Sequence, residues 1–408
     1  MEREQGEPTR FIGLDIHKHY LVATGVDGEQ ATVFGPQRVP YTRLERWIAD
    51  KLTEQDAVVI EMTTNSWEMY DALVDHVHSV TVVHPPHVTL ITRAQVMTDR
   101  KASLALAQLL AAGLLVSIWV PPVEVRDLRA LIAHRRKMVN LTTSIKNRLH
   151  SVLHRHHIAP PEGRGLFTAA QRDWWLSLPV TPLERFRIES DLDTLAFAQG
   201  QIARITTCLA EIAGQDERLP ILAQIAGIGM INGMTVLAAI GVIDRFPDDD
   251  HLVGYAGLGA RVHDSGLSHK GGRITKSGRR DLRGAMVEAA QTAARTHPHW
   301  KAEFRRLERR IGKQKAKVAV ARKLLIAVWH VLSKETADRF ATDEQIAKSL
   351  LRLAYKIGAA HLHTRDGHKL SAKAFTRYHL DRMGIGREVT DLVWSGRRVK
   401  LPPSMLPA

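Results

Sequence analysis

Three acidic residues in the first quarter of the chain have the types and spacing to hold a divalent cation. Asp15 and Glu61 each end a short apolar run, and Asp99 opens a segment of helical pattern. Carboxylates at two strand ends and one helix start supply the oxygen ligands that Mg²⁺ or Mn²⁺ requires. Each acid singly is ordinary at such a position, and Asp99 could simply cap its helix. Together they predict a cation-assisted phosphodiester site of a ribonuclease-H-like core.

A serine far along the chain adds a second kind of chemistry. Ser265 precedes Gly266 in a segment that we expect to be a basic loop. A serine that attacks a phosphate stores the bond as an enzyme ester, which another DNA end can reverse. Such an attack needs cations around the phosphorus, for which the candidates are Arg261, Lys270, Arg273, Lys276, Arg279 and Arg280. Ser-Gly is also an ordinary turn dipeptide, so a purely structural role stays open at this stage.

The composition favours a polyanionic partner. Lys and Arg number 57 against 43 Asp and Glu, which gives a formal charge of +14 and a pI near 10.0. Each neutralised phosphate releases condensed counterions, so nucleic acid ranks first as partner. A membrane surface would also attract this charge, and a merely soluble basic protein is the plain alternative. The length of 408 residues indicates two or three domains.

Cysteine content and hydropathy indicate a cytoplasmic protein. The single cysteine, Cys208, excludes an intramolecular disulfide and a Cys-based zinc cluster. The charged N-terminus has no apolar signal core. The longest apolar stretch, 104–120, is interrupted by polar residues and ends at Pro121-Pro122. We interpret it as a buried helix followed by a short strand, and we expect no membrane association.

Residues 10–120 alternate strand and helix patterns. Strands are expected at 11–16, 20–26, 31–35, 57–61 and 80–83, and helices at 42–52, 67–78 and 99–115. Three strands followed by alternating helices and strands predict an α/β domain with a mixed sheet.

From residue 123 the period changes to that of a coiled coil. One apolar seam runs from Leu128 to Val152 and a second from Leu192 to Leu209. The two helices could pair as an antiparallel hairpin or between subunits. The first helix is predicted to contact phosphates, because it is rich in cations that almost no acids balance: Arg129, Arg135, Arg136, Lys137, Lys146 and Arg148.

The remainder of the chain is expected to be mainly helical. A tight Gly227-Ile-Gly229 turn between apolar segments indicates a helix-hairpin-helix, whose turn amides can meet a phosphate. A close turn between two packed helices is the simpler interpretation. Helices are also expected at 281–296 and 315–333, and residues 340–408 show helical patches and turns without assignable chemistry.

Residues 10–335 resemble the IS110/IS1111 family of insertion-sequence transposases, also called bridge-RNA-guided recombinases. The matching motifs are Gly13-Leu14-Asp15-Ile16-His17-Lys18, Val59-Ile60-Glu61, Thr98-Asp99-Arg100-Lys101, the Gly227-Ile-Gly229 hairpin, and Tyr255-Ala-Gly-Leu followed by Ser265-Gly266 and Gly272-Arg-Ile-Thr-Lys276-Ser-Gly278. Their order and spacing make the resemblance specific.

The resemblance implies a domain order. It consists of a RuvC-like metal domain of the DEDD type (1–122), a coiled-coil and linker segment (123–215), a transposase domain (216–337) and a C-terminal extension (338–408). Asp15, Glu61 and Asp99 match the first three acids, which hold Mg²⁺ or Mn²⁺, and Ser265 matches the catalytic serine.

The resemblance also implies partners. They are target and donor DNA, a structured guide RNA and further copies of the chain in a dimer or tetramer, with the serine of one subunit completing the metal site of another. Such an enzyme excises, circularises and inserts its element in a prokaryotic cytoplasm, at the nucleoid.

One departure from the family pattern affects the metal site. The fourth acid is expected three residues after the third, and this position is Ala102. Either another group or water coordinates the metal in a natural branch, or the chain was altered. Three alternatives therefore stay open: a RuvC-like structure-specific nuclease with Ser265 as a turn residue, a nucleic-acid-binding protein without catalysis, and an invertase that acts at fixed sites without RNA.

Overall fold

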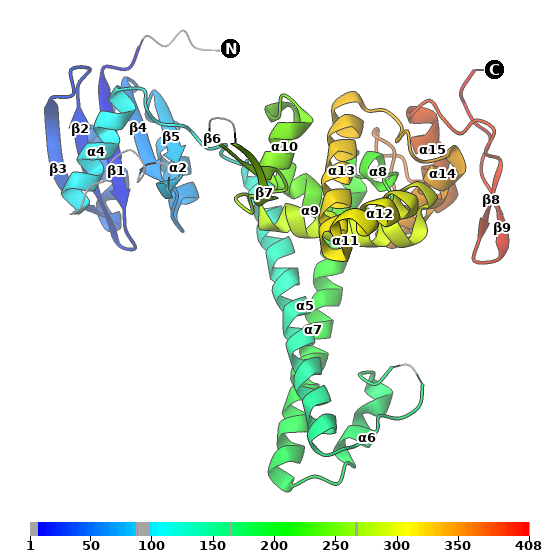
Figure 1. The fold of residues 1–408 in the computed structure, drawn as a ribbon. Coiled ribbons are helices and arrows are strands. Elements are labelled where there is room, and N and C mark those ends of the chain that lie inside the picture. Colours follow the sequence, from blue (N-terminus) through cyan, green and yellow to red (C-terminus); the bar gives the residue numbers. More distant parts are fainter. Residues whose placement is uncertain (1–6, 87, 89–97, 164, 266–267, 408) are drawn as a thin grey trace. The chain divides into compact units, whose positions relative to one another are not determined.

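The computed structural model describes residues 7–86, 88, 98–163, 165–265 and 268–407, with the backbone alone for 262–265 and 268–271. The chain divides into two compact units, residues 1–122 and 123–408 (Figure 1). The four-part division expected from the sequence is finer than these two units and stays a prediction. None of the described helices is both long and apolar enough to cross a bilayer.

The first unit contains a five-stranded mixed sheet with strand order β3-β2-β1-β4-β5. The first three strands form an antiparallel meander, and β4 and β5 run parallel to β1. The apolar runs of β1 and β4 are almost fully buried, which confirms the predicted mixed sheet. The strands are β1 (Arg10–Ile16), β2 (Tyr20–Val26), β3 (Thr32–Pro40), β4 (Asp56–Glu61) and β5 (Ser79–Val83).

Several boundaries in this unit differ from the predictions, among them the end of the helix expected at 67–78, which lies at Leu73. β3 continues to Pro40 through Gly35-Pro36, because an edge strand tolerates a residue without an N–H. Helix α4 (Asp99–Ala111) ends before 115 because Gly113 adopts the left-handed conformation that terminates helices. The expected strand after it is a single bridge between Ser117 and Val83. Further helices in the described part of this unit include the short η1 (Tyr41–Arg43), α1 (Leu44–Lys51) and α2 (Ser66–Leu73).

Helix α4 packs directly on β1 and β2 (Figure 1). A Cβ added at Gly13 would lie 2.0 Å from the carbonyl oxygen of Ser103, so only glycine permits this approach. The hydroxyls of Thr24 and Ser103 share a buried hydrogen bond of 2.8 Å between sheet and helix. These contacts fix the start of α4 beside the end of β1.

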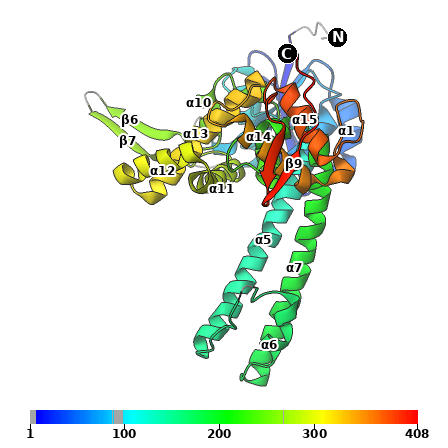
Figure 2. The ribbon, with the colours of Figure 1, turned by 90° about the vertical axis from the view of Figure 1, so that its right-hand side faces the viewer.

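The second unit begins with two long helices that form an antiparallel pair, α5 (Val123–Arg155) and α7 (Pro182–Gln215) (Figures 1 and 2). Arg155 contacts Glu184 at 2.8 Å, and Arg148 contacts Asp191 closer to the middle of the pair. The predicted helices therefore pair as a hairpin within one chain. Its far end is closed by η2 (Ala169–Gln171) and α6 (Arg172–Leu176), whose Trp175 is fully buried.

A helical body follows the hairpin. Its core is formed by α8 (Arg218–Ala223), α9 (Met230–Ile240), η3 (Ile243–Arg245), α10 (Asp249–Tyr255), α11 (Arg280–Thr296), α12 (Pro298–Ile311) and α13 (Lys313–Lys334). The Gly-Ile-Gly turn joins α8 to α9, and a Cβ at Gly227 would meet the carbonyl oxygen of Ala289 at 2.2 Å. The turn thus packs on α11, as a close turn between packed helices does.

The segment expected to be a basic loop is a two-stranded antiparallel hairpin. β6 (Ala260–Ser265) pairs with β7 (Ser268–Ile274), and Ser265 lies opposite Ser268 in the last pair before residues 266–267, which are outside the described range. Figure 2 shows the hairpin projecting beyond the helices of this unit. Charged residues in both strands and the two glycines of β7 hide the alternation that predicts a strand.

The C-terminal residues pack as a small helical layer with a second hairpin. They form α14 (Asp343–Ile357), η4 (Ala359–His361), α15 (Ala372–Arg382), β8 (Asp391–Trp394) and β9 (Arg397–Lys400). The buried Arg377 donates hydrogen bonds to the carbonyls of Pro402, Gly386 and Val389, which fixes the chain end on α15. The sequence predicted the helices but not the two strands.

Candidate metal centre and nucleic-acid interface

The sheet places Asp15 and Glu61 at one edge. β1 and β4 are parallel, and Leu14 lies beside Ile60 in their register. The next residue of each strand is the acid, so both carboxylates follow neighbouring buried positions at the carboxyl ends of the strands. This is the arrangement predicted from the two apolar runs.

Helix α4 brings Asp99 to the same edge. Asp99 is the first residue of the helix, and the hydroxyl of Thr98 caps it by accepting a hydrogen bond from the Lys101 amide. Tyr20 donates a hydrogen bond of 3.1 Å to Asp99 Oδ2. The acid is therefore held by a helix terminus and a strand side chain at once.

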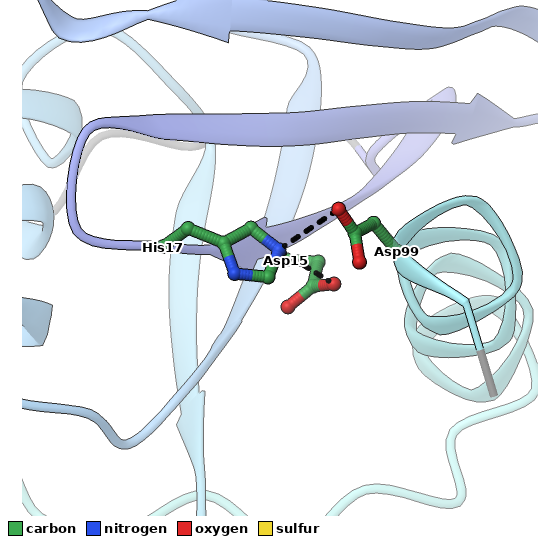
Figure 3. Close-up of side chains that lie close together, drawn as sticks. All are labelled: Asp15, His17 and Asp99. Atoms are coloured by element: carbon green, nitrogen blue, oxygen red, sulfur yellow. Dashed lines mark ion pairs between the residues drawn. The ribbon is translucent and has the colours of Figure 1, made fainter.

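A histidine completes the cluster. Nε2 of His17 lies 3.3 Å from Oδ2 of Asp15 and 3.3 Å from Oδ2 of Asp99 (Figure 3). Ligand atoms of these three residues all lie within 4.8 Å of one another; Glu61 does not belong to this group. His17 was not among the predicted site residues. The signal was present, because residues i and i+2 of a strand share a face and His17 follows Asp15 by two.

The electrostatics of the cluster suit a cation. Burial raises the pKa of Asp15, the charge of Asp99 raises it further, and His17 opposes both effects. Burial and the charge of Asp15 likewise raise the pKa of Glu61. Carboxylates that repel one another in this way are stabilised by a bound divalent ion. The donor set of carboxylate oxygens and one imidazole nitrogen therefore fits a divalent metal.

The position of the expected fourth acid offers no ligand. Ala102 lies one helical turn after Asp99 and is half-buried. The next hydroxyl, that of Ser103, bonds to Thr24 inside the protein. The structure thus retains the three predicted acids at one edge and presents a methyl group at the fourth position.

Comparison with known proteins agrees with this arrangement. Residues 12–158 match a family model described as a transposase of the DEDD type, and residues 219–305 match the "Transposase IS116/IS110/IS902 family". The chain belongs to the IS110 family of transposases. Members of this family recombine DNA, and the charge of the chain is consistent with that partner.

Several relatives of this transposase match over most of their length. The pilin gene-inverting protein of Moraxella bovis is 27% identical over 79% of this chain and 95% of its own. The transposase for insertion sequence element IS1111A of Coxiella burnetii is 24% identical over 83% of this chain and 93% of its own. A probable family 20 transposase of Pseudomonas aeruginosa is 25% identical over 80% of this chain and 98% of its own.

The serine of this transposase lies in the second unit, away from the acids in sequence. Ser265 ends β6 and pairs with Ser268. Its side chain and that of Lys270 lie outside the described residues. The role of Ser265 as nucleophile therefore stays a prediction.

Several cations predicted to contact phosphate make contacts inside the protein. Arg129 donates hydrogen bonds of 2.7 and 2.9 Å to the carbonyls of Ala238 and Ala239 at the end of α9. Burial, together with the charge of nearby Arg279, lowers the pKa of Arg129 to about 10. Arg245 and Arg218 donate to the next two carbonyls, of Ile240 and Gly241. These arginines cap a buried helix, where cations oppose the negative end of its dipole.

Other predicted cations are also engaged. Arg135 donates to the hydroxyl of Thr206 at 3.0 Å, Arg148 pairs with Asp191, and Arg279 pairs with Asp281. Lys146 lies over the ring of Phe167, and Arg261 donates to the carbonyl of Thr275. The predicted residues that are exposed, and for which a phosphate contact is the simplest role, are Arg136, Lys137, Arg273, Lys276 and Arg280.

Proposed function

We propose that this transposase exchanges DNA strands through a seryl ester on Ser265, assisted by a divalent metal at Asp15, Glu61 and Asp99. The convergence of Asp15 and Asp99 at one sheet edge is the observation that carries the metal part. The strand order and the acid positions also support a RuvC-like, ribonuclease-H-like fold for the first unit. The matched transposase family supports strand exchange rather than hydrolysis alone.

In this proposal, the acids of the first unit bind the metal ion that assists the reaction at the phosphate. Asp15 and Asp99 would hold Mg²⁺ or Mn²⁺ with Glu61, and such an ion stabilises attacking and leaving oxygens. Tyr20 holds the carboxylate of Asp99 in place. Because the packing of α4 on Gly13 fixes these groups before substrate binds, little reorganisation is needed at the moment of reaction.

Ser265 performs the transfer. Its hydroxyl oxygen forms a bond to the scissile phosphorus and loses its proton, while the bond from phosphorus to one sugar oxygen breaks and that oxygen leaves as a hydroxyl. A hydroxyl of a second DNA end then attacks the ester and releases the serine. Cations of the β6–β7 hairpin, such as exposed Arg273, would stabilise the charge on the phosphate.

Trapping the ester tests this function. Incubation of the chain with element-end DNA and Mn²⁺, followed by denaturing electrophoresis, should give a covalent protein–DNA adduct that disappears in Ser265→Ala. Cleavage without an adduct in both proteins would instead identify a structure-specific nuclease. Absence of cleavage under all conditions would identify a binding protein.

We also propose that a structured RNA guides the choice of DNA. Exposed cations on α5, such as Arg136 and Lys137, are compatible with such a partner. RNA that copurifies with the chain should be one defined structured transcript from beside its own gene. Target and donor DNA would be held by a dimer or tetramer, and in a prokaryotic cell the enzyme would act at the nucleoid.

A second candidate function is inversion at fixed sites without RNA. The relatives of Moraxella bovis and Moraxella lacunata, each 27% identical over 95% of their length, are named pilin gene-inverting proteins. Recombination that survives ribonuclease treatment and needs particular DNA sequences would favour this candidate. Random host RNA in the purified protein would count against guidance.

A further inference from the structure

In the cluster of Asp15, His17 and Asp99, His17 is the residue that the proposed function leaves without a role. We propose that His17 is a metal ligand whose nitrogen takes the place left by Ala102 and makes the site prefer Mn²⁺ over Mg²⁺. This inference rests on the proposed function, because it assumes that the cluster holds the metal of strand exchange.

The position of Nε2 is the first observation. The atom is shielded from solvent and, among the described residues, has no hydrogen-bond partner. It nevertheless points between the carboxylates of Asp15 and Asp99, with 3.3 Å to one oxygen of each (Figure 3). Contacts of this length without good hydrogen-bond geometry leave a buried nitrogen poorly satisfied, and a cation bound among the three groups would satisfy it.

The turn between β1 and β2 holds the imidazole in this place. The hydroxyl of Tyr41 and the side-chain amide of Asn65 both donate to the backbone carbonyl of His17. Its own amide donates to the carbonyl of Tyr20 at 2.9 Å, and the rings of His17 and Tyr20 lie 4.7 Å apart. Three contacts thus fix the backbone of His17 and one orients its ring, and none of them involves the acids.

Helix α4 gives the second observation. Its first residue, Asp99, reaches the cluster, but the residue one turn later on that face is Ala102. The ligand count therefore falls by one on the helix side. His17 supplies a ligand from the sheet side, two residues after Asp15.

A nitrogen ligand changes which metal binds best. Both ions bind carboxylate oxygens, but Mg²⁺ demands a strict octahedron and dehydrates reluctantly, whereas Mn²⁺ accepts an imidazole nitrogen beside carboxylates more readily. Replacing a carboxylate by His17 therefore lowers the affinity for Mg²⁺ relative to that for Mn²⁺. The chain should recombine DNA at lower concentrations of Mn²⁺ than of Mg²⁺.

Electron paramagnetic resonance of Mn²⁺ bound to the full chain tests the proposal directly. The spin-echo spectrum should contain modulation from a directly bound nitrogen, and labelling histidine with ¹⁵N should change it. His17→Ala should abolish the modulation and weaken Mn²⁺ binding by about tenfold or more. The matched control is His19→Ala, an exposed histidine of the same turn, which should change neither.

If His17 has a different role, His17→Ala should not weaken Mn²⁺ binding. If His17 is only a positive partner of the two acids, the wild-type spectrum shows no nitrogen modulation, and His17→Ala leaves Mn²⁺ binding equal or tighter. Either result overturns the proposal. The wild-type spectrum gives this answer even where His17→Ala does not fold.

Two further variants separate this inference from the proposed function. Asp99→Asn should weaken Mn²⁺ binding whatever the role of His17. If it does and His17→Ala does not, the inference fails alone; if neither variant has an effect, the metal site itself is wrong. In His17→Ala/Ala102→Asp, binding should return with the preference shifted toward Mg²⁺, and an unshifted preference would also overturn the inference.

Discussion

The acid edge of the first unit and the β6–β7 hairpin of the second are built in different ways. Asp15 and Asp99 are held by a buried sheet and by a helix packed against Gly13. Ser265 lies on a two-stranded hairpin, and an isolated hairpin of this kind is only marginally stable. The acid edge is therefore fixed by packing within the first unit, whereas β6 and β7 form a sheet of only two strands.

The largest effect should come from the hairpin. Ser265→Ala removes the proposed nucleophile, so recombination should fall by about a thousandfold or more. Because the acids are untouched, Mn²⁺ affinity and thermal unfolding should match those of the wild-type chain. Plasmid recombination and metal titration measure the two quantities, and a change in Mn²⁺ affinity would contradict the independence of the two regions.

The largest effect on the acid edge should come from Gly13→Ala. The new Cβ would lie 2.0 Å from a backbone oxygen of α4, so the helix must move. We expect the free energy of unfolding to fall by about 3 kcal/mol and Mn²⁺ affinity to fall with it. Gly28→Ala is the matched control, because nothing lies within 4 Å of its added Cβ. Equal effects of both substitutions in denaturant titrations would refute the close-packing explanation.

We expect Arg129 to stabilise the fold and not to contact nucleic acid. Arg129→Ala removes the side-chain donor to the carbonyl of Ala238 and the shortest of three donors to that of Ala239, so the free energy of unfolding should fall by about 2 kcal/mol. The salt dependence of nucleic-acid binding should stay unchanged in folded protein. A shallower salt dependence would show that Arg129 contacts phosphate after all.

Arg273 should behave in the opposite way. Its side chain is exposed on the hairpin, so Arg273→Ala should weaken DNA binding severalfold and reduce the slope of log K against log salt by about 1. Stability should not change. Binding titrations at several salt concentrations measure the slope, and an unchanged slope would remove Arg273 from the interface.

The smallest effect should be a pH dependence of stability without metal. The raised pKa of Asp15 means that the folded chain holds this proton more tightly than the unfolded chain. The resulting stabilisation is present in acid and is lost as pH rises through the folded pKa. Asp15→Asn should therefore be slightly more stable than the wild type near neutral pH, by less than about 1 kcal/mol, and lose this advantage in acid. Thermal unfolding in a chelator, from acid to neutral pH, checks both parts.

The acid edge could be predicted from the sequence because its positions follow local patterns. Apolar runs place Asp15 and Glu61 at strand ends, and Thr98-Asp99 is a helix start. His17 was not predicted because its spacing of two residues from Asp15 is only a weak signal by itself. Its significance depends on Asp99, which is distant in sequence and is brought near by the packing of α4.

The basic residues were harder to assign for a related reason. From the sequence alone, a basic residue on a long helix is predicted to be exposed, whether its side chain faces solvent or packs on another element. The partner of Arg129 is the end of α9, more than a hundred residues away, and only the tertiary structure reveals it. The β6–β7 hairpin was missed because its strands contain glycines and charges, and the β8–β9 strands because four residues are too few to show a period.

The length of the paired helices α5 and α7 sets how far their distal end lies from the helical body of the second unit. With 33 and 34 residues, each spans about 50 Å, which equals roughly 15 base pairs of B-DNA. The buried Trp175 cluster closes the far end, so the pair has a fixed reach. Inserting or deleting one heptad in both helices would move that end by about 10 Å, or three base pairs. Homologues that differ by whole heptads in this segment should accordingly differ in the spacing of whatever the far end contacts.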